Sequence, residues 1–214
     1  MADPLDVWRG VARSTNGEDY AHRYAEHFRR LAGSGEDVHG EATFVAGMLP
    51  PGSSVLDAGC GTGRVAARLA ELGYDVLGVD ADDAMVAVAR EEHPDLDWVV
   101  ADLAALDLGR TFDLVVLAGN VVPFIPPAAL PSALARVTAH LASDGRVVCG
   151  FGLDVAHLPP GGPVVPLPSY DEACRAAGLE LAERHSGWDG EPYDGGGYAV
   201  SVHRRRADRH GSVC

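Results

Sequence analysis

The sequence predicts a doubly wound α/β domain, in which a parallel sheet carries helices on both faces. Short apolar segments alternate with amphipathic ones from residue 54 to residue 151, and parallel strands need crossover helices of this kind. The last two strand-like segments have no helix between them, which favours an antiparallel pair. A chain of 214 residues with 47% apolar and 22% charged residues is long enough for one such domain.

Two helices are expected before the sheet begins. Aromatic and aliphatic residues recur at helical spacing over residues 18–32, and a Gly-Ser-Gly break follows them. A second helix is expected over residues 38–49, where Pro50 and Pro51 end it.

The core then alternates strands and helices. The expected strands are residues 54–58, 75–79, 96–101, 112–118, 145–151, 179–184 and 198–204. Asp82 is a suitable N-cap for a helix that ends at Glu92. Pro127 suits the first turn of a helix that carries an apolar stripe. The residues of that stripe are Leu130, Leu134, Val137 and Leu141. The remaining expected helices are residues 63–72 and residues 169–177, the latter after an N-cap at Ser169.

These segments divide the chain into three parts. Residues 1–52 form an N-terminal helical extension, and residues 53–205 form the core. Residues 206–214 are rich in arginine and are expected to be a disordered tail. Within the core, residues 152–168 are rich in Pro and Gly and are expected to be irregular.

A glycine-rich turn joins the first strand to its helix. It reads Asp57-Ala-Gly59-Cys-Gly61-Thr-Gly63-Arg64, and its alternate glycines allow the backbone to approach a ligand closely. The dinucleotide fingerprint requires Gly or Ala where this turn has Arg64. Asp57 is a poor neighbour for a pyrophosphate and a good acceptor for an ammonium group.

Two further acids end the next two strands. A carboxylate at Asp80 can accept hydrogen bonds from both ribose hydroxyls, and one at Asp102 can accept from the exocyclic amine of adenine. Because the carboxyl ends of parallel strands lie at one edge of a sheet, Asp57, Asp80 and Asp102 are expected to line one crevice.

This set of motifs resembles the class I S-adenosylmethionine-dependent methyltransferase family. The resemblance covers most of the chain and rests on residues 57–64, Asp80-Ala-Asp-Asp-Ala-Met85, Ala101-Asp102-Leu103 and residues 112–120. It implies a Rossmann-like seven-stranded sheet of order 3-2-1-4-5-7-6 with the last strand antiparallel. The implied cofactor is S-adenosylmethionine.

The resemblance also implies a cofactor site. The expected contacts are the backbone of Gly59, Gly61 and Gly63 to the methionine part, Asp57 near its ammonium, Asp80 on the ribose, Ala81 and Met85 beside the adenine, Asp102 and Leu103 on its edge, and Ala118 and Asn120 beside the sulfonium and the acceptor. An aromatic side chain of the N-terminal helices, Tyr24 or Tyr20, is expected to close over the cofactor.

The implied activity is methyl transfer to an O or N atom of a small-molecule acceptor by in-line displacement. Such a reaction needs a donor and an acceptor held collinear and dry. No catalytic residue is assigned. His22, His27 and the pair Asp154 and His157 are candidate bases, and Trp188 and Tyr193 are candidate acceptor contacts. A non-catalytic S-adenosylmethionine-binding protein and an NAD-dependent oxidoreductase remain alternatives.

Composition excludes several other classes. A net charge of −14 argues against nucleic-acid partners, and Asn120-Val-Val-Pro123 lacks the paired prolines of base N-methylating enzymes. No apolar run is long enough to cross a membrane, and no secretory leader is evident. Four scattered cysteines favour the reducing cytoplasm, and no metal-binding motif occurs. We expect a cytoplasmic monomer or homodimer.

Overall fold

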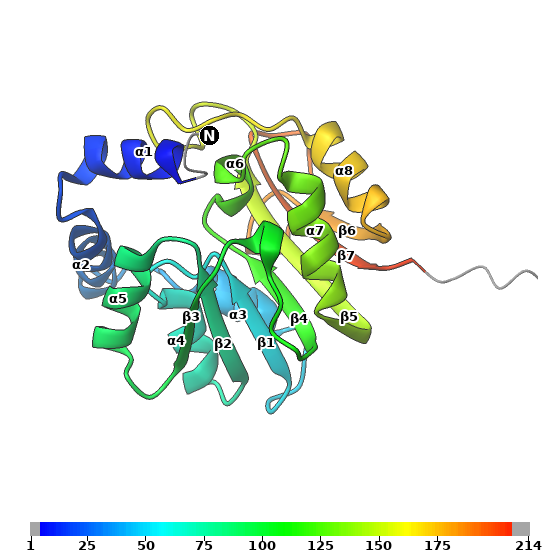
Figure 1. Ribbon diagram of the computed structural model, residues 1–214, viewed down its shortest axis with the longest axis horizontal. Coiled ribbons are helices and arrows are strands. Elements are labelled where there is room, and N and C mark those ends of the chain that lie inside the picture. Colours follow the sequence, from blue (N-terminus) through cyan, green and yellow to red (C-terminus); the bar gives the residue numbers. More distant parts are fainter. Residues whose placement is uncertain (1–4, 207–214) are drawn as a thin grey trace, which may run out of the picture.

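The computed structural model describes residues 5–206, and one seven-stranded sheet runs through them (Figure 1). The strand order is β3-β2-β1-β4-β5-β7-β6, as predicted. The first five strands pair in parallel, whereas β7 pairs antiparallel with both β5 and β6. The strands are β1 Ser54–Ala58, β2 Asp75–Asp80, β3 Asp97–Val100, β4 Phe112–Leu117, β5 Leu141–Gly152, β6 Leu179–His185 and β7 Tyr198–Arg205.

Eight α-helices and one short 3₁₀ helix are present in the described part of the chain. They are α1 Asp6–Asn16, α2 Tyr20–Gly33, α3 Gly40–Ala46, α4 Arg64–Glu71, α5 Asp83–Glu92, η1 Leu103–Ala105, α6 Val121–Phe124, α7 Leu130–Ala139 and α8 Leu167–Ala176. Helices α7 and α8 lie in front of the sheet in Figure 1, while α3 and α4 lie behind it. The predicted helices over residues 18–32 and 82–92 are confirmed to within two residues, with Asp82 as the N-cap of α5.

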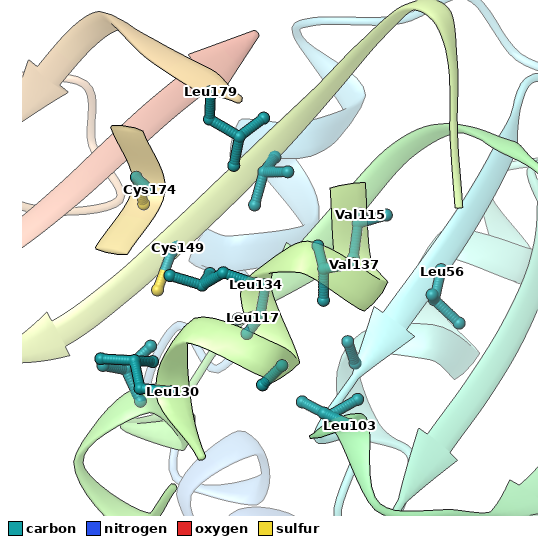
Figure 2. Close-up of a cluster of buried hydrophobic side chains, with 14 of the residues drawn as sticks. Leu56, Leu103, Val115, Leu117, Leu130, Leu134, Val137, Cys149, Cys174 and Leu179 are labelled. Atoms are coloured by element: carbon teal, nitrogen blue, oxygen red, sulfur yellow. The ribbon is translucent and has the colours of Figure 1, made fainter. Parts of the chain in front are cut away.

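Successive side chains of each strand point to opposite faces of the sheet, and a separate apolar core lies on each face. On one face, Leu56 and Val115 pack with apolar residues of α7 and α8 (Figure 2). On the other face, Val55, Leu114 and Val116 pack with residues of α3, α4 and α5. Because successive side chains of a strand point to opposite faces, continuous apolar strands of this kind are buried on both sides.

Four predicted details are wrong, each at the end of an element. The helix predicted over residues 38–49 ends at Ala46, before Pro50 is reached. Pro127 does not open α7, because residues 126–129 form a turn and the helix begins at Leu130. Leu141 does not lie on that helix, since it begins β5 and pairs with Phe112. Ser169 does not cap α8, which begins at Leu167. Apolar spacing locates a buried segment well but not the residue at which hydrogen bonding changes partners.

Helices α1 and α6 were not predicted, and neither was η1. All three are short or precede the first apolar stripe, so periodicity gives little signal for them. The division into an extension and a core stays a prediction. The predicted tail lies outside the described residues except for Arg206.

Candidate functional site

A cavity of about 470 Å³ opens at the carboxyl edge of the sheet. Its wall combines the turn between β1 and α4 with the ends of β2, β3 and β4, and with residues of α1, α2 and α6. Ten of the twelve predicted cofactor residues lie on this wall, namely Tyr24, Asp57, Gly59, Gly61, Asp80, Ala81, Met85, Asp102, Leu103 and Ala118. The other two, Gly63 and Asn120, do not. The sheet topology therefore gathers segments that are far apart in the sequence into one concave site.

The turn after β1 requires glycine for steric and conformational reasons. Gly59 and Gly63 both have φ of +88°, where side chains are rarely tolerated. A Cβ at Gly59 would lie 2.4 Å from Val121, and one at Gly63 would lie 2.4 Å from Trp98. Gly63 is the N-cap of α4, and its contact with Trp98 explains why it lies behind the cavity wall.

Asp57 is buried beneath the glycine turn. Its side chain is 1% exposed, and it accepts a hydrogen bond of 3.1 Å from the backbone N–H of Ala66. Burial raises the pKa of Asp57 to about 7, against the opposing effect of the Arg64 guanidinium. A cation bound in the cavity would favour the charged carboxylate, so this group is suited to an ammonium ligand.

Asp80 ends β2 with both carboxylate oxygens held by backbone groups. Oδ2 accepts from the N–H of Gly61 and Oδ1 from the N–H of Asp82, each at 2.8 Å. Burial raises its pKa, and these two N–H groups oppose the rise. Each oxygen retains a lone pair, so the fixed carboxylate can still accept hydrogen bonds from a diol.

Asp102 follows β3 and is exposed on the cavity wall. Its carboxylate accepts from the N–H of Ala104 at 2.9 Å and so caps η1. This cap orients the side chain at the cavity, next to the buried Leu103.

Arg64 also lies on the cavity wall, although the sequence predicted no role for it. Its guanidinium donates two hydrogen bonds to Glu41, at 2.6 and 2.8 Å, and one to the carbonyl of Val38. It also lies 4.5 Å from the centre of the Phe28 ring. The positive charge of Arg64 is thus paired with the negative charge of Glu41, and this ion pair joins α4 to α3.

Helix α1 covers the cavity, and the wall residues there are Trp8 and the N-cap residue Leu5. The Trp8 ring lies edge-on to Phe124 with centroids 5.2 Å apart, and its Nε1–H donates to Asp82 Oδ2 at 2.8 Å. The sequence did not predict this helix. The available signal was weak, since Trp8, Val11 and Ala12 are its only buried or half-buried apolar residues.

Asp82 joins both N-terminal helices to α5. Its carboxylate is fully buried and accepts from Trp8, from the Tyr20 hydroxyl at 2.6 Å, from Arg9 at 3.4 Å and from the N–H of Ala84 at 3.2 Å. Burial, together with this bond, raises the pKa of Tyr20 to about 12. Of the two tyrosines considered, Tyr24 lies on the cavity wall and Tyr20 lies on Asp82.

Asn120 braces the loop beside the cavity. It adopts the left-handed conformation with φ of +68°, accepts from the N–H of Gly152 at 2.6 Å and donates to the carbonyl of His157 at 3.4 Å. His157 Nδ1 in turn lies 2.7 Å from Asp154 Oδ1. Neither Asp154 nor His157 lies on the cavity wall.

The other candidate side chains lie elsewhere. His22 is exposed between Asp19 and Glu91, and Trp188 donates to the Tyr198 hydroxyl at 3.0 Å away from the cavity. His27 and Tyr193 also lie off the wall. No cluster of three or more metal-ligating side chains occurs within residues 5–206, and no helix there is long and apolar enough to span a membrane.

Known proteins are similar to this chain in sequence and in fold. A family model described as "Methyltransferase domain" matches residues 55–145. The crystal structure of a TehB-like SAM-dependent methyltransferase from Corynebacterium glutamicum superposes with a TM-score of 0.79 and 37% sequence identity, covering 87% of this chain and 98% of that one. The chain belongs to the class I S-adenosylmethionine-dependent methyltransferase family. 

Curated relatives of this methyltransferase differ in their acceptors. The dTDP-3-amino-3,6-dideoxy-alpha-D-glucopyranose N,N-dimethyltransferase of Streptomyces fradiae is 34% identical over 136 residues, or 61% of this chain and 53% of the relative. The ubiquinone biosynthesis O-methyltransferase of Paramagnetospirillum magneticum is 37% identical over 98 residues, or 44% of this chain and 38% of the relative. This methyltransferase spans about half the length, or less, of these two relatives.

Proposed function

We propose that this methyltransferase transfers a methyl group from S-adenosylmethionine to an O or N atom of a small-molecule acceptor. The observation that carries the proposal is the cavity at the carboxyl edge, where Asp57, Asp80 and Asp102 share one wall with the glycine turn. The cofactor has a sulfonium and an ammonium cation, and an acidic wall stabilises both. The glycine turn leaves room for its methionine part, because a Cβ on the turn would fill that space.

Each carboxylate has a distinct proposed role. Asp57 is placed to pair with the ammonium, and Asp80 to accept from the ribose hydroxyls. Asp102 would accept from the adenine amine, with Ala81 and the buried Met85 beside the ring. The bound cofactor supplies a methyl group on a good leaving group.

The protein contributes mainly orientation and dryness. Trp8 and Tyr24 would close the cavity over the site, and Ala118 follows β4 beside it. Holding two reactants in line is worth roughly 7–11 kcal/mol of barrier. None of the candidate bases chosen from the sequence lies on the described wall, which suits an acceptor whose lone pair is free before transfer.

The acceptor atom is proposed as either O or N. One curated relative is named as an N,N-dimethyltransferase and another as an O-methyltransferase, so both chemistries occur on similar sequences. The apolar side chains of the cavity wall would surround an O or an N acceptor atom in the same way.

Calorimetry with S-adenosylhomocysteine and with NADH tests the cofactor. We expect S-adenosylhomocysteine to bind and NADH not to bind. Replacing Asp80 with Ala should weaken S-adenosylhomocysteine binding by about 1–3 kcal/mol, because ribose hydroxyls would lose a buried acceptor. Asp83→Ala is the matched control, since Asp83 is three residues away and its side chain is 76% exposed. Unchanged affinity in Asp80→Ala would remove the ribose assignment.

An acceptor screen with radiolabelled cofactor tests catalysis itself. Transfer of label to any small molecule supports the proposal. Tight cofactor binding with no transfer across a broad screen, and no slow hydrolysis of the cofactor, would instead favour a non-catalytic binding protein.

A further inference from the structure

We infer that the acceptor is an uncharged, predominantly apolar small molecule that bears no phosphate or other anionic group. This inference rests on the proposed function and concerns the part of the cavity that the cofactor contacts do not use. It is carried by the single cationic side chain of the described wall, which is already paired, and by the apolar lining.

The cavity wall of the described chain has one cationic side chain, Arg64, and three carboxylates. Arg64 already donates twice to Glu41 and once to Val38, and it is 17% exposed. A phosphate recruited to Arg64 would therefore have to displace Glu41 and leave that carboxylate buried without its partner, which is costly.

The loops after β4 and β5 contain no Arg or Lys. Residues 119–129, after β4, supply five wall residues and contain no charged side chain. Residues 152–168, after β5, supply no wall residue and contain neither Arg nor Lys. The one histidine there, His157, has its Nδ1 within 2.7 Å of Asp154. On α1, Arg9 lies 2.8 Å from Asp83 and 3.4 Å from Asp82, so its charge is directed to α5.

Prolines lower the number of backbone N–H groups, the other common ligands of phosphate, in the loops after β4 and β5. Residues 119–131 and 152–168 hold nine of the 14 prolines of the chain, and proline has no N–H. On the cavity wall itself this applies to Pro126. The helix α6 beside it is only a single turn of four residues.

Apolar residues make up most of the remaining wall. Beyond the proposed cofactor contacts, the wall has eight apolar residues, Leu5, Trp8, Val65, Val100, Val121, Phe124, Ile125 and Pro126; the other five are Cys60, Thr62, Arg64, Ala101 and Gly119. Val100 is also 42% exposed. A cavity lined mainly by apolar side chains is typical of a site for an apolar ligand.

A matched pair of fluorescent probes tests the inference. Anilinonaphthalene is neutral and apolar, and anilinonaphthalene sulfonate differs from it by one anionic group. We expect the protein saturated with S-adenosylhomocysteine to bind the neutral probe about tenfold or more tightly, because the sulfonate would be desolvated without a partner. Pyrophosphate should not displace the neutral probe.

Introducing a cation should reverse this preference. Ile125→Arg places a guanidinium on the wall and should bring the two affinities together or favour the sulfonate. Leu181→Arg is the matched control, because Leu181 is 45% exposed on β6 and off the wall. If Ile125→Arg does not fold, Val100→Arg replaces it, since Val100 lies on the wall and is 42% exposed.

Three results would overturn the inference in the wild-type protein. They are equal or tighter binding of the sulfonate, displacement of the neutral probe by pyrophosphate, and no binding of the neutral probe at all. Failure of the proposed function is a separate result, because it would appear first as an absence of S-adenosylhomocysteine binding.

Discussion

Two buried ionisable residues, Asp57 and His203, show how burial can be the largest influence on the pKa of a side chain. Burial raises the pKa of Asp57 to about 7 and lowers that of His203 to about 4. In both cases the charged form is disfavoured. Asp57 lies on the cavity wall, where a cationic ligand can reverse the effect, whereas His203 lies in β7 beneath α8, where no such ligand can enter.

The affinity for S-adenosylhomocysteine should rise as the pH increases from about 6 to 8. Below its folded pKa of about 7, Asp57 must lose a proton to pair with the ammonium, so binding releases a proton. The expected slope approaches about tenfold per pH unit on the acid side. Calorimetry in buffers of different ionisation enthalpy measures the released proton directly.

Asp57→Asn should abolish that slope while keeping an acceptor for the N–H of Ala66. Affinity at pH 8 should fall by about 1.5–3 kcal/mol, the range for a charged hydrogen bond. An unchanged pH profile in this variant would show that another group carries the proton.

The unfolding free energy should decrease as the pH falls from about 6.5 to 4, in part through His203. The imidazole is protonated near pH 6.5 in the unfolded chain but only near pH 4 in the folded one, so the unfolded state binds the proton first. This single group should remove about 3 kcal/mol over that window. His203→Phe keeps the ring packed on Tyr170 and should show a correspondingly shallower profile in denaturant titrations.

At the scale of elements, Asp82 holds helices α1 and α2, which form the cover of the cavity, against α5. Helices α1 and α2 make few contacts with the sheet itself, and their polar anchors, Trp8 and Tyr20, converge on this one carboxylate of α5. Asp82 also donates its backbone N–H to Asp80, the proposed ribose ligand. The cover and the cofactor site therefore share one rigid turn.

Asp82→Asn should destabilise this arrangement by about 2–4 kcal/mol, because one buried acceptor becomes a donor facing other donors. Hydrogen exchange of α1 should accelerate before that of the sheet. Tyr20→Phe removes a single donor and should cost about 1 kcal/mol. In the control Asp95→Asn, at an exposed residue beyond the end of α5, exchange of α1 should remain near the wild-type rate.

At the scale of the whole molecule, the cavity joins segments from Leu5 to Pro126. A ligand that fills it contacts both the N-terminal helices and four strand ends, and binds only the folded chain. Binding should therefore be coupled to global stability.

S-adenosylhomocysteine at about one hundred times its dissociation constant should stabilise the fold by about 2.7 kcal/mol. For a chain of this size that corresponds to a rise in Tm of roughly 5–10 °C. Scanning calorimetry should show the shift in the wild type and in Asp83→Ala, and a smaller one in Asp80→Ala at the same ligand concentration. A ligand-independent Tm in the wild type would contradict the site.

Most of the sheet was predictable because its signals are local. Apolar runs ending in Asp57, Asp80 and Asp102 mark strands, and the glycine turn marks the first crossover. The boundary errors at Pro127, Leu141 and Ser169 arise where backbone hydrogen bonds, which depend on neighbouring elements, decide the end of a helix or strand.

By itself the sequence determined the α/β alternation, the glycine turn and the three acids at one edge of the sheet. These follow from short-range patterns: the periods of helices and strands, and the steric need for glycine in one turn. The strand order and the other predicted wall residues came from the resemblance to the methyltransferase family. Only the tertiary structure decided that Trp8 covers the cavity, that Arg64 is occupied by Glu41, and that Asn120 braces a loop. Such pairings join residues distant along the chain, and only the packed fold brings them into contact.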